Sequence, residues 1–182
     1  MKNHYLEHTK NWVREFVIGL NLCPFAKAPY SFDRIRYSLY ETDDVQAFAE
    51  SLLHELLFLL DEPEESVETT IMVHPNVLND FHDYLDFLDW AQDILKESKL
   101  EGIIQIASFH PNYQFDGTEM TDVENYSNRS PYPMLHLLRE SSVTKAVSRH
   151  EDAEAIPDQN MELLRKLGIE NIQERLKKIE DL

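Results

Sequence analysis

The sequence has few of the residues that build disulfides, phosphate-binding loops or membrane spans. Its 182 residues include one cysteine, Cys23, which cannot form an internal disulfide, so no oxidising compartment is implied. The chain holds four glycines and no glycine-rich motif, which excludes a nucleotide-binding loop and a dinucleotide fingerprint. The longest apolar run, Leu56–Leu60, is far shorter than the roughly 20 residues that cross a bilayer.

Basic residues are also scarce, with 17 Lys and Arg against 34 Asp and Glu and a net charge of −17. Nucleic-acid backbones and anionic membranes both attract cationic surfaces, so we expect neither as a partner. The first eight residues contain no apolar signal core, and we therefore expect a cytoplasmic protein. Hydrophobic residues make up 42% of the chain, which is enough for the core of one ordinary domain.

The acidity is concentrated in the middle of the chain. Residues 1–40 hold three acids and six bases, or +3, whereas residues 41–101 hold seventeen and two, or −15. Residues 102–150 carry −1 and residues 151–182 carry −4. The negative charge is therefore mainly a solvated surface on two central helices, and it does not exclude an anionic ligand elsewhere.

Hydrophobic periodicity predicts helices and strands in alternation. Alternating or continuous β-rich runs predict strands at 34–40, 67–73 and 103–109. Helical spacing predicts helices at 8–20, from Thr42 to about Pro63, from His74 to about Ser98, at 156–167 and at 169–182. Ser130 and Pro131 read as the start of a further helix that continues to about Val147.

Strands separated by helices are typical of parallel βαβ units. We therefore predict an α/β fold with one domain spanning residues 1–182. It has a small, mostly parallel sheet of three or four strands flanked by helices. Residues 155–182 form a helical appendage at the C-terminus, where a homodimer contact would be built.

Two histidines follow apolar strands in the same local pattern. Val73–Asn76 and Phe109–Asn112 both read apolar residue, His, Pro, Asn. Parallel strands would bring His74 and His110 to the carboxyl edge of the sheet, where α/β proteins bind ligands. There the two imidazoles could act as general acid and base, or simply cap backbone groups where each strand ends.

A dense polar segment precedes the predicted helix at 131–147. A helix start favours anions, and Arg129 beside it can form a fork to a carboxylate or phosphate. Arg129 could instead pair with a loop acid such as Asp122. Residues of this segment predicted to bind or position substrate are Asn125, Asn128, Arg129, Ser130 and His136, with Arg139 on the same helix face as His136.

Other candidate chemistry is less well specified. Cys23 is a possible nucleophile only if a cation lowers its pKa, and a lone cysteine is more often a small buried hydrophobe. His74, His110 and His136 could hold a divalent metal, although no close-spaced ligand motif is present. His4 and His8 have i, i+4 spacing but lie near a terminus that we expect to fray. No organic cofactor is predicted.

Three stretches resemble a known family. They are Gly19–Ala26, Gln105–Phe115 and Asn128–Glu140, and Ile156-Pro157 followed by Asn160 extends the resemblance towards the C-terminus. Together they are similar to a bacterial family catalogued as domain-of-unknown-function family 1415. The resemblance implies a small bacterial cytoplasmic protein and implies no activity. The same stretches contain most of the candidate site residues.

These observations favour a small enzyme, a hydrolase or group transferase, acting on an anionic metabolite with a carboxylate or phosphate. In this hypothesis Arg129 and Ser130 bind the anion, His110 or His74 transfers protons, and Arg139 supports charge in the transition state. One alternative is a metal-dependent hydrolase that uses His74, His110 and His136. The other is a non-catalytic protein whose acidic face binds a basic partner.

Overall fold

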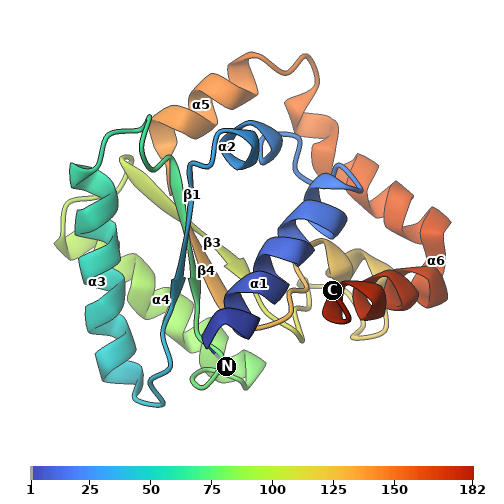
Figure 1. Ribbon diagram of the computed structural model, residues 1–182, viewed down its shortest axis with the longest axis horizontal. Coiled ribbons are helices and arrows are strands. Elements are labelled where there is room, and N and C mark those ends of the chain that lie inside the picture. The colour runs from blue at the N-terminus through green and yellow to red at the C-terminus, as the bar shows by residue number, and fades with distance from the viewer. Residues whose placement is uncertain (1) are drawn as a thin grey trace.

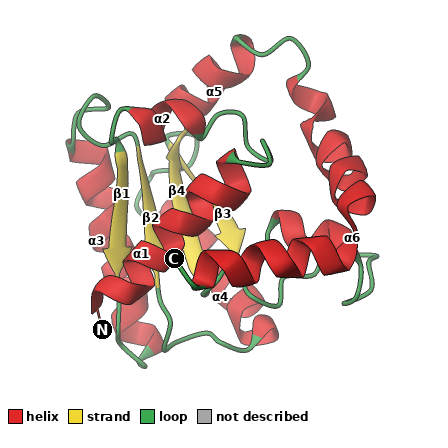
Figure 2. Ribbon diagram, turned by 45° about the vertical axis from the view of Figure 1, so that its right-hand side comes forward, coloured by secondary structure: helices red, strands yellow, loops and turns green. Residues whose placement is uncertain are grey.

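A four-stranded mixed sheet forms the centre of the protein (Figures 1 and 2). The computed structural model describes the backbone of residues 2–182 and the side chains of residues 4–182. The strands are β1 (Ile35–Leu39), β2 (Thr69–Val73), β3 (Ile104–Phe109) and β4 (Met134–Arg139), in the order β1-β2-β4-β3. β1 pairs with β2 in parallel, while β4 is antiparallel to both β2 and β3. β1, β2 and β3 therefore all end at one edge, the carboxyl edge.

Two amphipathic helices cover one face of the sheet, α3 (Val45–Asp61) and α4 (Phe81–Glu97). Each begins at an aspartate, Asp44 or Asp80, whose carboxylate accepts hydrogen bonds from two N–H groups of the first turn. Their apolar faces pack with even-numbered residues of β2 and odd-numbered residues of β4, among them Met72, Leu135 and Leu137. Burial of this face drives the packing of both helices onto the sheet.

The opposite face is covered by the two ends of the chain, as Figure 2 shows. α1 (Lys2–Trp12) continues into a π-helical turn, η1 (Val13–Ile18), and both pack with α6 (Ile156–Glu180) around Trp12, Phe16 and Ile172. α6 bends at Gly168, whose φ of 73° lies in the left-handed region that favours glycine. The predicted division of this segment into helices before and after Gly168 is confirmed.

Short elements complete the chain. They are α2 (Lys27–Ser31), η2 (Val123–Ser127), α5 (Glu140–Ser148) and η3 (Ala153–Ala155). Within residues 2–182, none of the helices combines the length and apolar character needed to cross a membrane.

The predicted α/β fold class is confirmed, as are the three predicted strands to within about two residues at each end. The sheet is mixed rather than mostly parallel, because β4 lies between β2 and β3 and is antiparallel to both. The prediction of a helix over 131–147 is wrong, since residues 134–139 form β4 and only Glu140–Ser148 is helical. The apolar run in Met134–Leu138 fits both a buried strand and a helix face, so periodicity alone does not separate them. Pro131 and Pro133 favour extended backbone before them, which opposes a helix start.

The helix predicted from His74 begins later than expected. α4 starts at Phe81, and residues 74–80 form a connecting loop that includes Leu78 at a φ of 60°. The side chain of Asp80, rather than the His-Pro-Asn segment, provides the N-cap. At the N-terminus, α1 begins at Lys2, so helix precedes the predicted start at residue 8.

Tyr84 of α4 joins the last residue of β3 to the first residue of β4. Its buried hydroxyl donates to the carbonyl of Met134 at 2.7 Å and accepts from the N–H of Phe109 at 3.1 Å. Phe109 and Met134 are register partners, so this hydroxyl closes the β3–β4 ladder at the carboxyl edge.

Replacing Tyr84 with Phe should therefore lower the free energy of unfolding by about 1–3 kcal/mol, because two buried backbone groups lose a partner. Urea denaturation followed by circular dichroism measures this change. Tyr113→Phe is the matched control, since the Tyr113 hydroxyl makes one long bond of 3.3 Å to Ser108. A loss as large in the control as in Tyr84→Phe would contradict this account.

Candidate functional site

Three loops meet at the carboxyl edge of the sheet. β2 ends before His74, β3 ends before His110, and β4 begins after Pro133. The N–H of His74 donates to the carbonyl of Pro133 at 3.1 Å, and that of His110 donates to the carbonyl of Asn128 at 3.2 Å. The structure thus brings both histidines to the same edge, which follows from β2 and β3 being parallel.

The His110 imidazole is buried and fully hydrogen-bonded. Its Nε2 donates to the carbonyl of Leu78 at 3.1 Å, while its Nδ1 accepts from the N–H of Asn112 at 3.0 Å. This pattern requires the neutral ring with its proton on Nε2. Burial lowers the pKa of His110, which favours the same neutral state. With both nitrogens engaged, the ring acts as a structural connector between loops.

His74 is also buried, with Nδ1 donating to the carbonyl of Val77 at 3.0 Å. Its ring lies 4.3 Å from that of Phe48, measured between centroids, and it stacks on Tyr84. Nε2 has no partner among the described residues. Burial, with the neighbouring His110, lowers the pKa of His74 to about 3. Aromatic side chains enclose this ring, and His74 does not line the cleft described below.

His136 lies in the middle of β4 on the other face of the sheet. It is the register partner of Ile71, which belongs to the apolar cluster beneath α1 and α6. Its Nε2 is 2.7 Å from the Thr69 hydroxyl, and burial lowers its pKa to about 4. His74 and His110 contact α4 instead, so the structure does not bring the three histidines together. Among the side chains of residues 4–182, no three His, Cys, Asp or Glu groups are placed to hold a metal ion.

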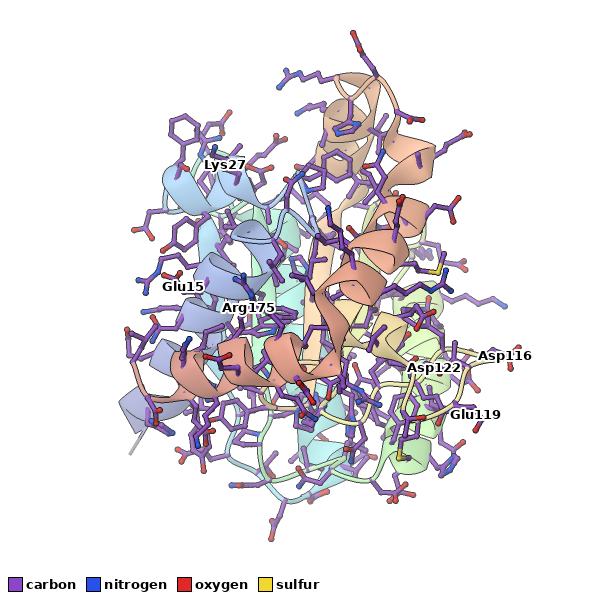
Figure 3. The ribbon with its side chains drawn as sticks, turned by 90° about the vertical axis from the view of Figure 1, so that its right-hand side faces the viewer. Glu15, Lys27, Asp116, Glu119, Asp122 and Arg175 are labelled. Atoms are coloured by element: carbon purple, nitrogen blue, oxygen red, sulfur yellow. The ribbon has the colours of Figure 1, made fainter. Side chains whose placement is uncertain are left out.

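Asn125 and Asn128 organise the loop between β3 and β4. The buried Asn125 amide accepts from the N–H of Phe115 and donates to the carbonyl of Glu119. Asn128 donates to the carbonyl of Ser108 at 3.1 Å. Both side-chain amides therefore form hydrogen bonds with the backbone of this loop and of β3. Asp116, Glu119 and Asp122 gather on this loop at the margin of the molecule (Figure 3).

Arg129 is anchored by the same loop. Its Nε donates to the carbonyl of Tyr113 at 3.1 Å and its Nη2 to that of Met120 at 2.6 Å. The guanidinium also lies 4.7 Å from the centre of the Tyr126 ring. A guanidinium has five N–H groups, so these two bonds leave donors for a ligand. Ser130 is not a helix cap; its hydroxyl donates to the carbonyl of Tyr132 within the extended segment that leads into β4.

Arg139 and Cys23 lie away from the carboxyl edge. Arg139 is the last residue of β4 and donates to the carbonyls of Glu62 and Val67. It therefore holds the loop before β2 against the end of β4. Because β4 is a strand, His136 and Arg139 do not share a face as predicted. Phe25, two residues after Cys23, contacts His150 beyond α5, at the edge opposite His110 (Figure 1). Burial raises the pKa of the Cys23 thiol, which disfavours the nucleophilic thiolate.

The cleft at this edge lies on the face covered by α1 and α6 and has a volume of about 500 Å³. Of the predicted site residues, Arg129 and Ser130 line it. We call it the α1–α6 cleft. Its walls come from α1, the segment between β3 and β4, and the second half of α6. The lining residues are His8, Trp12, Pro111, Tyr126, Arg129, Ser130, Pro131, Gln173, Leu176, Lys177, Ile179 and Glu180.

His8 is held in position within this cleft. Its Nδ1 is 3.0 Å from the Tyr132 hydroxyl, and its ring packs edge-on against the Tyr132 ring. Burial lowers the pKa of His8, and the carboxylate of Glu180 opposes that shift. The neutral imidazole therefore predominates at neutral pH. This arrangement, a half-buried histidine oriented by a second polar group, is typical of a general acid or base.

Trp12 and Lys177 add further hydrogen-bond donors. The Trp12 side chain is buried, and its indole N–H has no acceptor among the described residues. A buried donor without a partner is unfavourable by about 1–3 kcal/mol, which a ligand acceptor nearby would offset. Lys177 is exposed on α6 and lines the same cleft.

Sequence reasoning missed His8, Trp12 and Lys177. The i, i+4 spacing of His4 and His8 was the available signal for His8. It was discounted because a terminus is expected to fray, whereas α1 packs along its length against β1 and α6. Nothing in the local sequence around Lys177 indicates that α6 folds back onto α1.

The comparisons with known proteins identify the family. The family model described as a protein of unknown function, DUF1415, matches residues 4–174. The chain therefore belongs to the DUF1415 family, and the resemblance found in the sequence is confirmed. No curated protein and no solved structure matches the chain.

The two strongly shifted histidines predict loss of stability in acid. The pKa values of His74 and His136 fall from 6.5 to about 3 and about 4 in the folded protein. Below pH 6.5 the unfolded chain therefore binds protons that the folded chain does not, so the free energy of unfolding falls. Each group contributes a slope of about 1.4 kcal/mol per pH unit between its two pKa values.

His136→Gln tests this contribution, because the glutamine amide can still donate to Thr69 from the position of Nε2 but does not titrate. Urea denaturation at several pH values between 6.5 and 4 should give a slope shallower by about 1.4 kcal/mol per pH unit than the wild type. Parallel curves for the two proteins would show that His136 is not the buried neutral group described above.

Proposed function

We propose that this member of the DUF1415 family is a small enzyme, a hydrolase or group transferase, that acts on an anionic metabolite in the α1–α6 cleft. The observation that carries the proposal is the assembly of this one cleft from three distant segments. α1 contributes an imidazole, the segment after β3 contributes a guanidinium, and α6 contributes an ammonium group. The substrate bears a carboxylate or a phosphate.

The place and size of the cleft support a small-molecule ligand. Ligands of open α/β sheets bind beyond the carboxyl ends of the strands, and this cleft lies at that edge. Its volume of about 500 Å³ falls within the range of small-molecule sites, roughly 300–1,000 Å³. The apolar side chains of Leu176 and Ile179 would contact the uncharged part of the substrate.

Charge and hydrogen-bond donors support an anion. Arg129 is fixed by two backbone carbonyls and retains unused N–H groups, so it binds with little loss of side-chain entropy. Lys177 lies across the cleft on a flexible side chain and adds a second positive charge. Glu180 also lines the cleft, so its lining carries two positive charges, Arg129 and Lys177, against one negative charge, although the whole protein is strongly acidic.

His8 is the group best placed to transfer protons. Tyr132 orients its Nδ1, which leaves Nε2 for the substrate or an attacking water. Asn125, Asn128 and His110 support the site indirectly, because they fix the loop and backbone that carry Arg129. Of the predicted catalytic residues, His110 uses both ring nitrogens in structural hydrogen bonds. His74 is not among the residues that line this cleft.

Anion binding is tested with a thermal-shift panel of inorganic phosphate, pyrophosphate and small dicarboxylates. At least one of these anions should raise the melting temperature of the wild type. Lys177→Met should lower the affinity for that anion by about tenfold, because a charged contact is lost. Lys178→Met is the matched control, because Lys178 lies one residue on and pairs with Glu174 instead. Equal losses in both variants, or no ligand in the panel, would count against the proposal.

The role of His8 is tested by incubating the protein with a mixture of bacterial metabolites and following the anions by mass spectrometry. The wild type should consume at least one acid, and His8→Gln should slow this by roughly 10²–10⁴-fold. His54→Gln, at an exposed histidine of α3 outside the cleft, should leave the rate unchanged. Because the pKa of His8 is lowered, the rate should decline only in acidic solution. An unchanged rate in His8→Gln would overturn this role.

A further inference from the structure

The α1–α6 cleft contains one carboxylate among its basic groups. Glu180 lines the cleft together with Arg129 and Lys177, at the end of α6 that lies beside α1 (Figures 1 and 2). Glu180 is exposed, and its side chain forms no hydrogen bond or ion pair with another residue in the part of the chain that the structure describes. The carboxylate is therefore available to a ligand.

The position of Glu180 is unfavourable for the helix that carries it. Glu180 is the last residue of α6, where the aligned carbonyl groups give the helix end a partial negative charge. Basic side chains such as Lys177 and Lys178 are favoured in this last turn, whereas an acidic side chain is disfavoured. The carboxylate and the helix end together form a negative region that a bound cation would stabilise.

The negative and positive groups of the cleft belong to different walls. Burial lowers the pKa of His8, and the Glu180 carboxylate opposes this shift. The pKa of Tyr132 is raised by burial, by Tyr5 and by the same carboxylate. Glu180 therefore lies near the hydrogen-bonded pair of His8 and Tyr132, whereas Arg129 is held by the loop between β3 and β4.

The charges of the lining indicate the charges of the ligand. Arg129 and Lys177 are positive and Glu180 is negative, so a simple anion would leave the carboxylate unpaired beside a bound negative charge. Like charges brought together in this way oppose binding. A ligand with two anionic groups and one ammonium group pairs all three side chains. One group of opposite charge also lets a site reject similar ligands that lack its partner.

We propose that the substrate of the α1–α6 cleft is a small amino diacid, with one protonated amine and two anionic groups, each a carboxylate or a phosphate. The inference rests on the proposed function, because it identifies the substrate class of the same site. Arg129 and Lys177 bind the two anionic groups. The ammonium group lies at the Glu180 carboxylate and the end of α6. The neighbouring His8 is neutral and does not repel it.

Isothermal titration calorimetry with ligands that differ by one group tests this substrate class. Aspartate, glutamate and phosphoserine are each compared with the acid that lacks the amine and with the acid in which a hydroxyl replaces it. The titrations are made at about pH 7.5, where His8 is neutral and the amine is protonated. At least one amino diacid should bind about tenfold more tightly than both of its analogues, because they lack the charged contact to Glu180.

The contact to Glu180 is tested by removing its charge. Glu180→Gln should lower the affinity for the amino diacid by about fivefold or more. The same variant should bind the amine-free acid as tightly as the wild type or more tightly, because a repulsion is removed. A misfolded variant would lose both ligands. Glu170→Gln is the matched control, an exposed acid of α6 outside the cleft, and should change either affinity by less than about twofold.

The outcomes separate this inference from the proposed function. Amine-free or hydroxy acids that bind as tightly as the amino diacids would overturn the inference and leave the proposed function standing. Equal losses of both kinds of ligand in Glu180→Gln would do the same, as would binding of inorganic phosphate without binding of any amino diacid. If neither these acids nor any anion of the thermal-shift panel binds, the proposed function fails and the inference fails with it.

Discussion

The neutral imidazole of His110 is the contact on which the carboxyl edge depends. Its two nitrogens join the loop after β2 to the turn after β3, through Leu78 and Asn112. Its backbone bonds to Asn128 and Ser130, which hold the segment that leads into β4. One residue thus fixes three loops. Its side-chain bonds form only while the ring is uncharged, because a proton on Nδ1 would face a second donor.

The position of the α1–α6 cleft follows from this junction. Arg129 and Ser130 are adjacent to the backbone that His110 holds, and Asn125 fixes the loop whose carbonyls anchor the guanidinium. Tyr84 closes the β3–β4 ladder beneath the same point. The structural His110 and the cleft-lining Arg129 therefore lie on adjoining segments. The sequence pattern around His110 pointed to the carboxyl edge of the sheet. The His110 imidazole maintains the geometry of this edge, whereas His8 lines the cleft.

How far the fold could be predicted depended on whether each signal was local. The strands before His74 and His110 were predictable because both runs are short, rich in β-branched residues and end in His-Pro, which favours extended backbone. β4 was not, since Met134–Leu138 satisfies helical and strand periods alike, and only pairing with β2 and β3 decides between them. The site was harder still. His8 and Lys177 lie 169 residues apart, and their approach depends on the bend of α6 at Gly168 and its packing on α1.

The family match covers one side of the α1–α6 cleft more fully than the other. Residues 4–174 match the family, and this range supplies His8, Trp12, Arg129 and Ser130. Of the facing wall on α6, Gln173 lies inside the matched range, and Leu176 to Glu180 lie beyond it. The imidazole and guanidinium therefore belong to the part of the chain that defines the family, while the ammonium of Lys177 does not. Under the proposed function, the groups assigned to proton transfer and anion binding lie in the matched range, whereas Lys177 lies outside it. The same fold can therefore keep the first groups while the second varies.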